Sequence, residues 1–202
     1  MRLPHQVRGT ATVPQSLNKY PGQKRAGVAD HQGHDQAQAH ERLGNHRQAL
    51  ADREKALALG PNDPRLLNRL AWRYVTGPVM SRDPARALPL ARRAVELGPN
   101  EATYQNTLGV VLYRLDRYPE AIPVLEKSLA LGKGRWDAFD HFFLAMCHAK
   151  LRDAGKARDC FARAAKWVDG QKGLSAQHVQ ELKAFRAEAE AVLSGLKQAP
   201  EE

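Results

Sequence analysis

The sequence predicts an all-α solenoid of stacked helical hairpins that ends in a capping helix. Residues 84–98 and residues 118–132 repeat each other at a spacing of 34 residues, with Ala87 matching Ala121. A period of about 20–50 residues is typical of stacked supersecondary units. Within each unit, apolar residues recur every three to four positions, as on one face of an α-helix, and proline or glycine follows most of the helical stretches.

The amino-terminal part of the chain is predicted to differ from the rest. Residues 1–33 contain several prolines and glycines and show no hydrophobic periodicity, so we expect them to be disordered or poorly ordered. Residues 34–62 are expected to form a degenerate hairpin. Its second half is apolar at helical spacing, whereas the stretch from Asp35 to Arg42 is mostly polar and can bury little.

Three further hairpins are predicted, over residues 64–99, 102–135 and 138–170. Each begins with a helix that turns an apolar stripe inward, passes through a short turn and ends with a second amphipathic helix. In the first of these hairpins, Asp83 is expected to cap the second helix and Pro84 to occupy its first position.

Residues 175–196 are predicted to form a last, amphipathic helix, with Ser175 as its N-cap. Its apolar residues share one stripe: Val179, Leu182, Phe185, Ala189 and Val192. A helix of this kind after the last repeat is expected to cover the open end of the solenoid. Residues 197–202 are expected to fray.

The placement of small residues resembles that of the tetratricopeptide (TPR) repeat. A leucine followed by a small residue recurs in the first helices as Leu70-Ala71, Leu108-Gly109 and Leu144-Ala145, and an alanine recurs in the second helices as Ala49, Ala87, Ala121 and Ala157. The resemblance implies a right-handed superhelix whose concave surface is lined by the first helices.

The repeats depart from the family pattern in two ways. Gly109 and Ala121 are 12 residues apart, whereas Ala71 and Ala87 are 16 apart, so the hairpin over residues 64–99 carries a four-residue insertion in its turn. The early tryptophan of the family is also missing. Its positions are occupied here by Leu67, Gln105 and His141.

Some segments also look like the TPR tails of large bacterial multidomain proteins, often serine/threonine kinases or WD-repeat proteins. The segments are residues 68–72, 82–87, 142–146 and 182–189. This resemblance implies a signalling or scaffold context. It does not imply kinase activity, because the sequence has no glycine-rich phosphate loop followed by the kinase catalytic motifs.

Composition and charge narrow the class of protein. No apolar run approaches the roughly 20 residues that span a bilayer, and the first 13 residues lack the apolar core of a secretory signal. Two cysteines do not make a disulfide framework, so a cytoplasmic location is expected. The net charge of +9 is spread along the chain without a block of like charges, which does not favour binding to nucleic acid.

The concave surface is the predicted binding site. Its candidate residues come from the first helices: Arg65, Asn68, Trp72, Thr103, Asn106, Tyr113, Arg114 and Met146. We expect Asn68 and Asn106 to hydrogen-bond the backbone of an extended peptide and the apolar members to pack on its side chains. Arginines at the rim, Arg114 among them, favour an acidic partner or a C-terminal carboxylate. Alternatively, the asparagines are solvated helix residues and Trp72 packs between repeats or under the cap.

No metal, cofactor or catalytic site is predicted. Four histidines fall near the amino terminus: His31, His34, His40 and His46. No cysteine or carboxylate pair completes a ligand set with them at a known spacing. Cys147 and Cys160 are expected to be buried free thiols. The lysine, asparagine and arginine set of the chaperone-binding TPR proteins does not occur at matching positions, which argues against a chaperone tail as partner.

The sequence therefore predicts a non-catalytic protein–protein interaction module that binds a peptide or partner protein and no small-molecule substrate or membrane. A first alternative is a structural role, such as oligomerisation or packing within a larger signalling assembly. A second is RNA binding, since helical-hairpin repeats can read bases. Binding driven by phosphates would weaken steeply with salt, and groove binding by aromatic residues would not.

Overall fold

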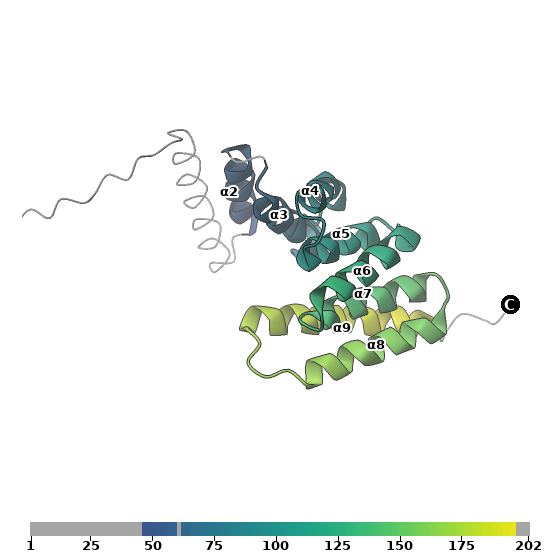
Figure 1. The fold of residues 1–202 in the computed structure, drawn as a ribbon. Coiled ribbons are helices and arrows are strands. Elements are labelled where there is room, and N and C mark those ends of the chain that lie inside the picture. The colour runs from purple at the N-terminus through teal and green to yellow at the C-terminus, as the bar shows by residue number, and fades with distance from the viewer. Residues whose placement is uncertain (1–45, 60–61, 197–202) are drawn as a thin grey trace, which may run out of the picture.

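The computed structural model describes residues 46–59 and 62–196, and the regular structure within those ranges is helical (Figure 1). The helices follow in chain order: α2 (His46–Leu59), α3 (Pro64–Thr76), the short 3₁₀ helix η1 (Val79–Ser81), α4 (Pro84–Leu97), α5 (Ala102–Arg114), α6 (Tyr118–Gly132), α7 (Asp137–Lys150), α8 (Ala154–Asp169) and α9 (Ala176–Leu196). The predictions for residues 1–33 and 197–202, and for most of the first half of the 34–62 hairpin, lie outside the described residues.

The helices begin where the sequence supplies caps. The carboxylate of Asp63 accepts hydrogen bonds from the backbone N–H groups of Arg65 and Leu66 at the start of α3, and Pro64 occupies the first position. Asp83 and Asp153 cap α4 and α8 in the same way. Each cap satisfies backbone donors that the first turn leaves unpaired, which is worth about 1 kcal/mol.

Successive helices pack as antiparallel hairpins, α3 with α4, α5 with α6 and α7 with α8, and the hairpins stack in chain order. Small residues at the crossings let the backbones approach closely. Gly109 shows how tight one crossing is, since a Cβ atom there would lie 2.5 Å from Cγ and Cδ2 of Leu125 on α6. The all-α hairpin solenoid predicted from the sequence is confirmed.

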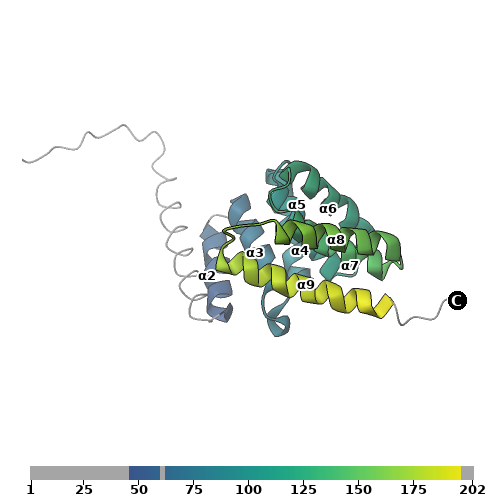
Figure 2. The same ribbon diagram turned by 90° about the horizontal axis from the view of Figure 1, so that it is seen from below.

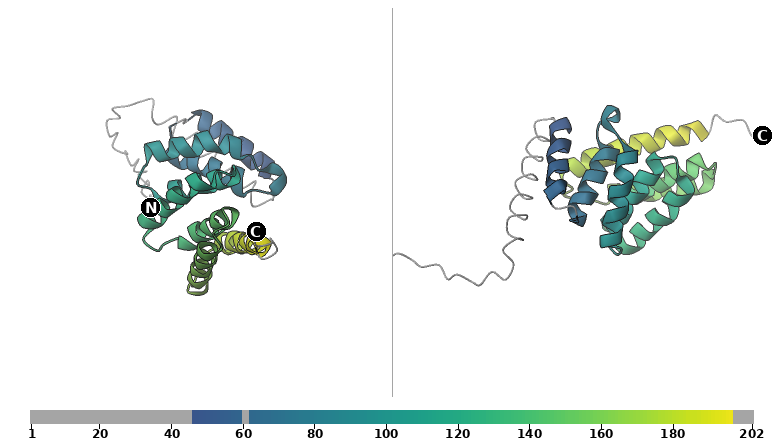
Figure 3. Two further views of the ribbon diagram at one scale, coloured as in Figure 1. Left: turned by 90° about the vertical axis from the view of Figure 1, so that its right-hand side faces the viewer. Right: turned by 90° about the horizontal axis from the view of Figure 1, so that it is seen from above.

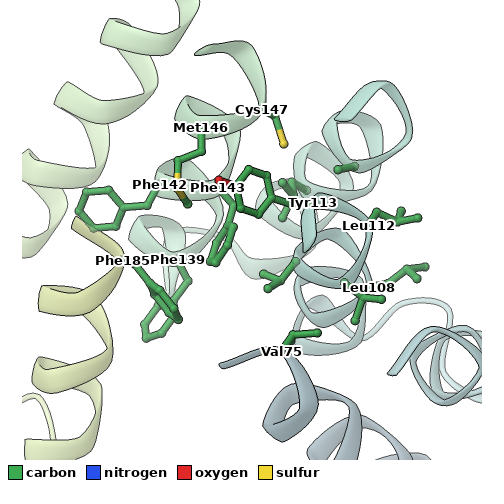
Figure 4. Packing of buried hydrophobic residues seen from close by; sticks show 14 of the residues in the cluster. Val75, Leu108, Leu112, Tyr113, Phe139, Phe142, Phe143, Met146, Cys147 and Phe185 are labelled. Atoms are coloured by element: carbon green, nitrogen blue, oxygen red, sulfur yellow. The ribbon is translucent and has the colours of Figure 1, made fainter. Parts of the chain in front are cut away.

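The core is richest in α7, whose inward and outward faces are both covered. Phe142 packs against Phe161 of α8, with ring centroids 5.7 Å apart, and Phe143 packs against Phe185 of α9 at 5.0 Å. Figure 4 shows Phe143 between Tyr113 of α5 on one side and Phe185 on the other, and Phe142 turned away from α5. Helix α7 is therefore at the centre of the core.

The last helix caps the stack as predicted but extends further across it than the sequence indicated. Ser175 caps it as predicted, since its hydroxyl accepts the N–H of His178. We call the side of the stack made by α3, α5 and α7 the inner face. Beyond covering α8, α9 packs along α7 and crosses this face, as Figures 2 and 3 show. Phe185 of α9 reaches Trp72 of α3, with ring centroids 6.0 Å apart. The capping helix thus spans three hairpins instead of covering only the end.

Candidate partner-binding site

A pocket of about 370 Å³ opens on the inner face where α9 crosses it. Its lining comes from α3 (Asn68, Trp72), α5 (Ala102, Thr103, Asn106, Thr107), α6 (Ser128, Gly132), the residue before α7 (Trp136), α7 (Asp137, Phe139, Asp140) and α9 (Gln177, His178, Glu181). Pockets that hold a ligand group commonly measure about 300–1,000 Å³ and combine aromatic residues with a few polar groups. This pocket has both components.

The aromatic part of the pocket is a packed cluster. Trp136 lies against His178, with ring centroids 4.6 Å apart, and Phe139 lies 6.0 Å from the same imidazole. Trp72 faces Phe139 from α3 at 6.3 Å and touches Phe185 behind it. Rings that pack against one another in tilted and edge-on arrangements hold each other in place, so the aromatic wall is preformed.

The polar part of the pocket centres on Asp140, whose side chain is 4% exposed. Asn106 Nδ2 donates to its Oδ1 at 2.8 Å, and Ser128 Oγ lies 2.9 Å from its Oδ2. Burial raises the pKa of the Asp140 carboxyl to about 7; the charge of Asp137 adds to this, and the bonds from Asn106 and Ser128 oppose it. The carboxyl is therefore poised between its two protonation states at neutral pH.

The geometry around Ser128 fits a protonated Asp140. The Ser128 hydroxyl has one proton but lies within hydrogen-bond distance of two acceptors, the Ala102 carbonyl oxygen at 3.0 Å and Asp140 Oδ2. When Asp140 is protonated, its O–H donates to Ser128 Oγ and Ser128 donates to Ala102, so every group is satisfied. When Asp140 is ionised, the hydroxyl can serve only one of the two acceptors well.

Asn68 contributes an unsatisfied acceptor. Its Oδ1 atom is buried and accepts no hydrogen bond within the part of the chain that the structure describes. A buried acceptor without a donor costs about 1–3 kcal/mol. Because Asn68 lines the pocket, a ligand donor that reached this atom would be favoured.

The carboxyl groups of the pocket lining are not matched by any lysine or arginine among the described residues of that lining. Asp137 and Glu181 stand at the edge of the pocket from α7 and α9, with Asp140 deeper. Gln177 donates to Glu181 Oε1 at 3.0 Å along α9. The electrostatic surroundings therefore favour a positive group over a negative one.

The residues predicted from the sequence fall into two groups. Four of them line the pocket together: Asn68, Trp72, Thr103 and Asn106. Arg65 is exposed at the start of α3 and is not part of the lining. Trp72 both lines the pocket and packs under α9, so the two interpretations given for it from the sequence describe one arrangement.

Three predicted residues lie elsewhere. Met146 is fully buried, and Tyr113 is 6% exposed and packs on Phe143 at 5.3 Å between ring centroids, so neither can supply an open contact surface. Arg114 is not a free rim cation, because its guanidinium donates to both carboxylate oxygens of Glu188 on α9. The physical reason is common to the three: α9 and the packing between hairpins cover the carboxyl-terminal half of the inner face.

Among the pocket residues that sequence reasoning missed are Asp140, which lies inside a predicted repeat, and three that lie outside the repeats: Trp136, His178 and Glu181. Matching Gly109 with Ala145, 36 residues on, aligned Asn106 with Phe142 and passed over Asp140. The available signal was an aspartate inside a helix rich in phenylalanine, a position where a charge must find partners.

Other groups singled out from the sequence form no site here. Cys147 is buried, and burial raises the pKa of its thiol to about 12, while Cys160 is partly buried. Three of the four amino-terminal histidines lie outside the described residues, and His46 begins α2. Within residues 46–59 and 62–196, no helix is both long and apolar enough to cross a membrane, and no group of three or more His, Cys, Asp or Glu side chains is arranged to hold a metal.

Comparison with known proteins agrees with the hairpin geometry. A family model described as tetratricopeptide repeat matches residues 81–135. The fold is that of a TPR solenoid. A crystal structure of MamA protein superposes with a TM-score of 0.59 at 19% identity, covering 84% of this chain and 91% of that chain. MamA residues 41 to end from Desulfovibrio magneticus RS-1 give a TM-score of 0.58 at 20% identity, covering 84% and 94%.

A third solved structure is similar over part of its length only. The K341M mutant of the Thermobaculum terrenum O-GlcNAc transferase superposes with a TM-score of 0.56 at 22% identity, over 70% of this chain but 26% of that enzyme. No curated protein sequence matches the chain. At these identities the likeness establishes the TPR fold and leaves the function to be argued from the pocket.

Proposed function

We propose that this TPR solenoid is a non-catalytic protein-interaction module that holds a segment of a partner protein in the pocket on its inner face. The main support for the proposal is the pocket itself. It combines a preformed aromatic wall with a side-chain acceptor, Asn68 Oδ1, that has no hydrogen-bond donor among the described residues. Aromatic anchors in a preformed pocket are the usual centre of a protein-binding surface. The TPR fold supports the proposal, because stacked helical hairpins present extended surfaces of this kind.

The pocket accounts for binding without catalysis. Its titratable groups are carboxyls and one imidazole, and the carboxyl that is deepest, Asp140, is engaged by Asn106 and Ser128. A catalytic constellation would need a nucleophile whose base and orienting group converge on it. The thiols of Cys147 and Cys160 lie outside the pocket lining, and burial raises the pKa of each, which disfavours the nucleophilic thiolate.

The test is to block the pocket without removing packing. Thr103 is exposed on α5 and lines the pocket, so Thr103→Trp fills the space while the stack stays intact. Glu126→Trp adds the same ring at an exposed position of α6 outside the lining and serves as control. The original chain and each variant are used to retain proteins from lysate of the source organism, with and without nuclease treatment.

We expect a partner that the original chain and Glu126→Trp retain and that Thr103→Trp loses. Retention that is equal for the two variants would contradict binding at this pocket. Retention that disappears on nuclease treatment would favour RNA binding instead.

A structural role is favoured by a different observation. The turn that carries the four-residue insertion exposes two apolar side chains, Val79 at 72% and Met80 at 98%. An apolar tip of this kind suits packing on another domain or a second copy of the chain. If it acts in this way, Val79→Ser with Met80→Ser should lower the mass measured by light scattering for any self-assembled species. The source context of a kinase or WD-repeat protein and a cytoplasmic location stay predictions.

A further inference from the structure

We propose that the pocket takes a lysine or arginine side chain presented by the partner segment, an inference that rests on the function proposed above. Three features of the pocket point to a cation: its aromatic rings, its carboxyl groups and an acceptor without a donor. Each is independent of the others.

The rings provide faces and edges within one space. Trp72, Trp136 and Phe139 surround the pocket from α3 and from the start of α7. A cation held near the faces of several rings is attracted by their quadrupoles, most strongly by tryptophan. The long methylene stem of lysine or arginine would cover the same apolar surface.

The carboxyls supply the counter-charge. Asp137 and Glu181 stand at the edge of the pocket, and Asp140 lies deeper. The imidazole of His178 is the other titratable side chain in the lining. The chain as a whole carries a net charge of +9, yet no positive side chain lines this pocket among the described residues. A local negative site on a basic protein is the arrangement expected where a specific cation is bound.

The acceptors need a donor that the described residues do not provide. Asn68 Oδ1 is buried without a hydrogen-bond donor. An ammonium has three donors and a guanidinium five, so either can serve Asn68 and a carboxylate together. A cation would also stabilise the ionised form of Asp140, whose burial otherwise keeps it partly protonated near pH 7.

The same features argue against the acidic partner favoured by the sequence. Arg114, on which that expectation partly rested, is paired with Glu188. A carboxylate entering the pocket would meet Asp137, Asp140 and Glu181 and no lysine or arginine of the lining. Like charges at close range in a partly desolvated space oppose binding.

The experiment selects a displayed library of random peptides against the full chain and measures the affinity of enriched peptides by fluorescence anisotropy. We expect enrichment of a lysine or arginine at one fixed position. Replacing that residue by norleucine, which keeps the stem and removes the charge, should weaken binding at least about fivefold, as loss of a partly desolvated cation–π contact does.

Two matched variants of α9 assign the effect to the pocket. Glu181→Gln removes a pocket charge but keeps the oxygen that accepts from Gln177, and it should weaken the selected peptide severalfold. Glu190→Gln makes the same change on the exposed side of α9, where Glu190 pairs with Arg186, and should leave the affinity unchanged.

The possible outcomes separate this inference from the proposed function. Enriched peptides that lack a basic residue, or that bind Glu181→Gln as well as the original chain, would overturn the cationic ligand; if Thr103→Trp still abolishes their binding, the function stands. No enriched peptide, or peptides insensitive to Thr103→Trp, would overturn both.

Discussion

At the scale of single residues, the Asp140 carboxyl should make stability depend on pH. Its pKa is raised from 3.8 to about 7 in the folded chain. Between those values the folded state holds a proton that the unfolded state releases, so this group's contribution to stability is present below pH 4 and is lost as the pH rises to about 7. A pKa change of one unit corresponds to about 1.4 kcal/mol, so the rise from 3.8 to about 7 makes the loss on the order of 4 kcal/mol.

Asp140→Asn tests this directly. The amide imitates the protonated carboxyl, since it can accept from Asn106 and donate to Ser128. We expect the variant to be the more stable protein at both pH values and by a larger margin at pH 8 than at pH 5, measured by urea unfolding at both. His141 and His148, whose pKa values are lowered by burial, titrate in both proteins and cancel in the comparison. An equal difference at the two pH values would contradict a raised pKa.

Gly109 is a second residue with a sharp consequence. Alanine is a better helix former than glycine by about 1 kcal/mol. At this position the added Cβ would lie 2.5 Å from side-chain atoms of Leu125, which is itself fully buried, so the leucine or the helices must shift. Overpacking costs about 1–3 kcal/mol, so Gly109→Ala should destabilise the chain on balance.

Gly195 provides the control for that change. It lies within α9, and a Cβ there would meet nothing within 4 Å. Gly195→Ala should therefore be neutral or stabilising by up to about 1 kcal/mol in thermal or urea unfolding. If both substitutions stabilise, the crossing at Gly109 is looser than described.

At the scale of elements, local signals made most helices predictable. The start signal Asp83-Pro84 and the apolar stripe of residues 84–98 are recognisable from residues close together in the sequence. The helix they predict is observed, since α4 begins at Pro84 and ends at Leu97. The repeat also predicted which small residues allow close packing. Gly109 and Ala121 stand where the two helices of a hairpin cross, and this crossing recurs from one hairpin to the next.

The position of α9 could not be read in the same way. Its single apolar stripe would be buried equally by covering the end of the stack or by crossing the inner face. The choice depends on contacts across long sequence separations, such as Trp72 with Phe185 and Arg114 with Glu188. The position of this helix determines which predicted site residues are accessible. Asn68 and Asn106 line a pocket. The other three are buried or paired: Tyr113, Met146 and Arg114.

The Arg114–Glu188 pair is the polar attachment of α9 to α5. The Arg114 side chain is 11% exposed, so Glu188→Gln would leave a largely buried cation without its counter-charge. We expect a loss of about 1–3 kcal/mol. Glu190→Gln, which removes an exposed pair with Arg186, should cost less than about 0.5 kcal/mol. Equal unfolding midpoints in urea for the two variants would show that the pair does not secure α9.

At the scale of the whole molecule, α9 changes how the stack should unfold. Units of a simple solenoid contact only their neighbours, and their stabilities can separate. Here α9 joins α3, α5 and α7, so the hairpins over residues 64–170 should unfold together. We expect circular dichroism and tryptophan fluorescence to give coincident urea transitions for the full chain.

Removal of residues 175–202 should break that coincidence. It uncovers Trp72, Phe139 and Phe143, which pack on Phe185. The truncated chain should unfold at lower urea, with the two probes giving different midpoints. Coincident transitions after truncation would mean that packing between neighbouring hairpins is enough for cooperativity.

The path of α9 also bears on elasticity. A helical solenoid bends like a spring when its successive units tilt slightly against one another. The 21 residues of α9 lie across the curved stack and connect its hairpins. Aromatic contacts hold α9 to α3 and α7, and an ion pair holds it to α5. Bending the stack of hairpins would break those contacts, so α9 fixes the curvature of the stack. A partner therefore meets an opening of constant width, and little binding free energy is lost in shaping it.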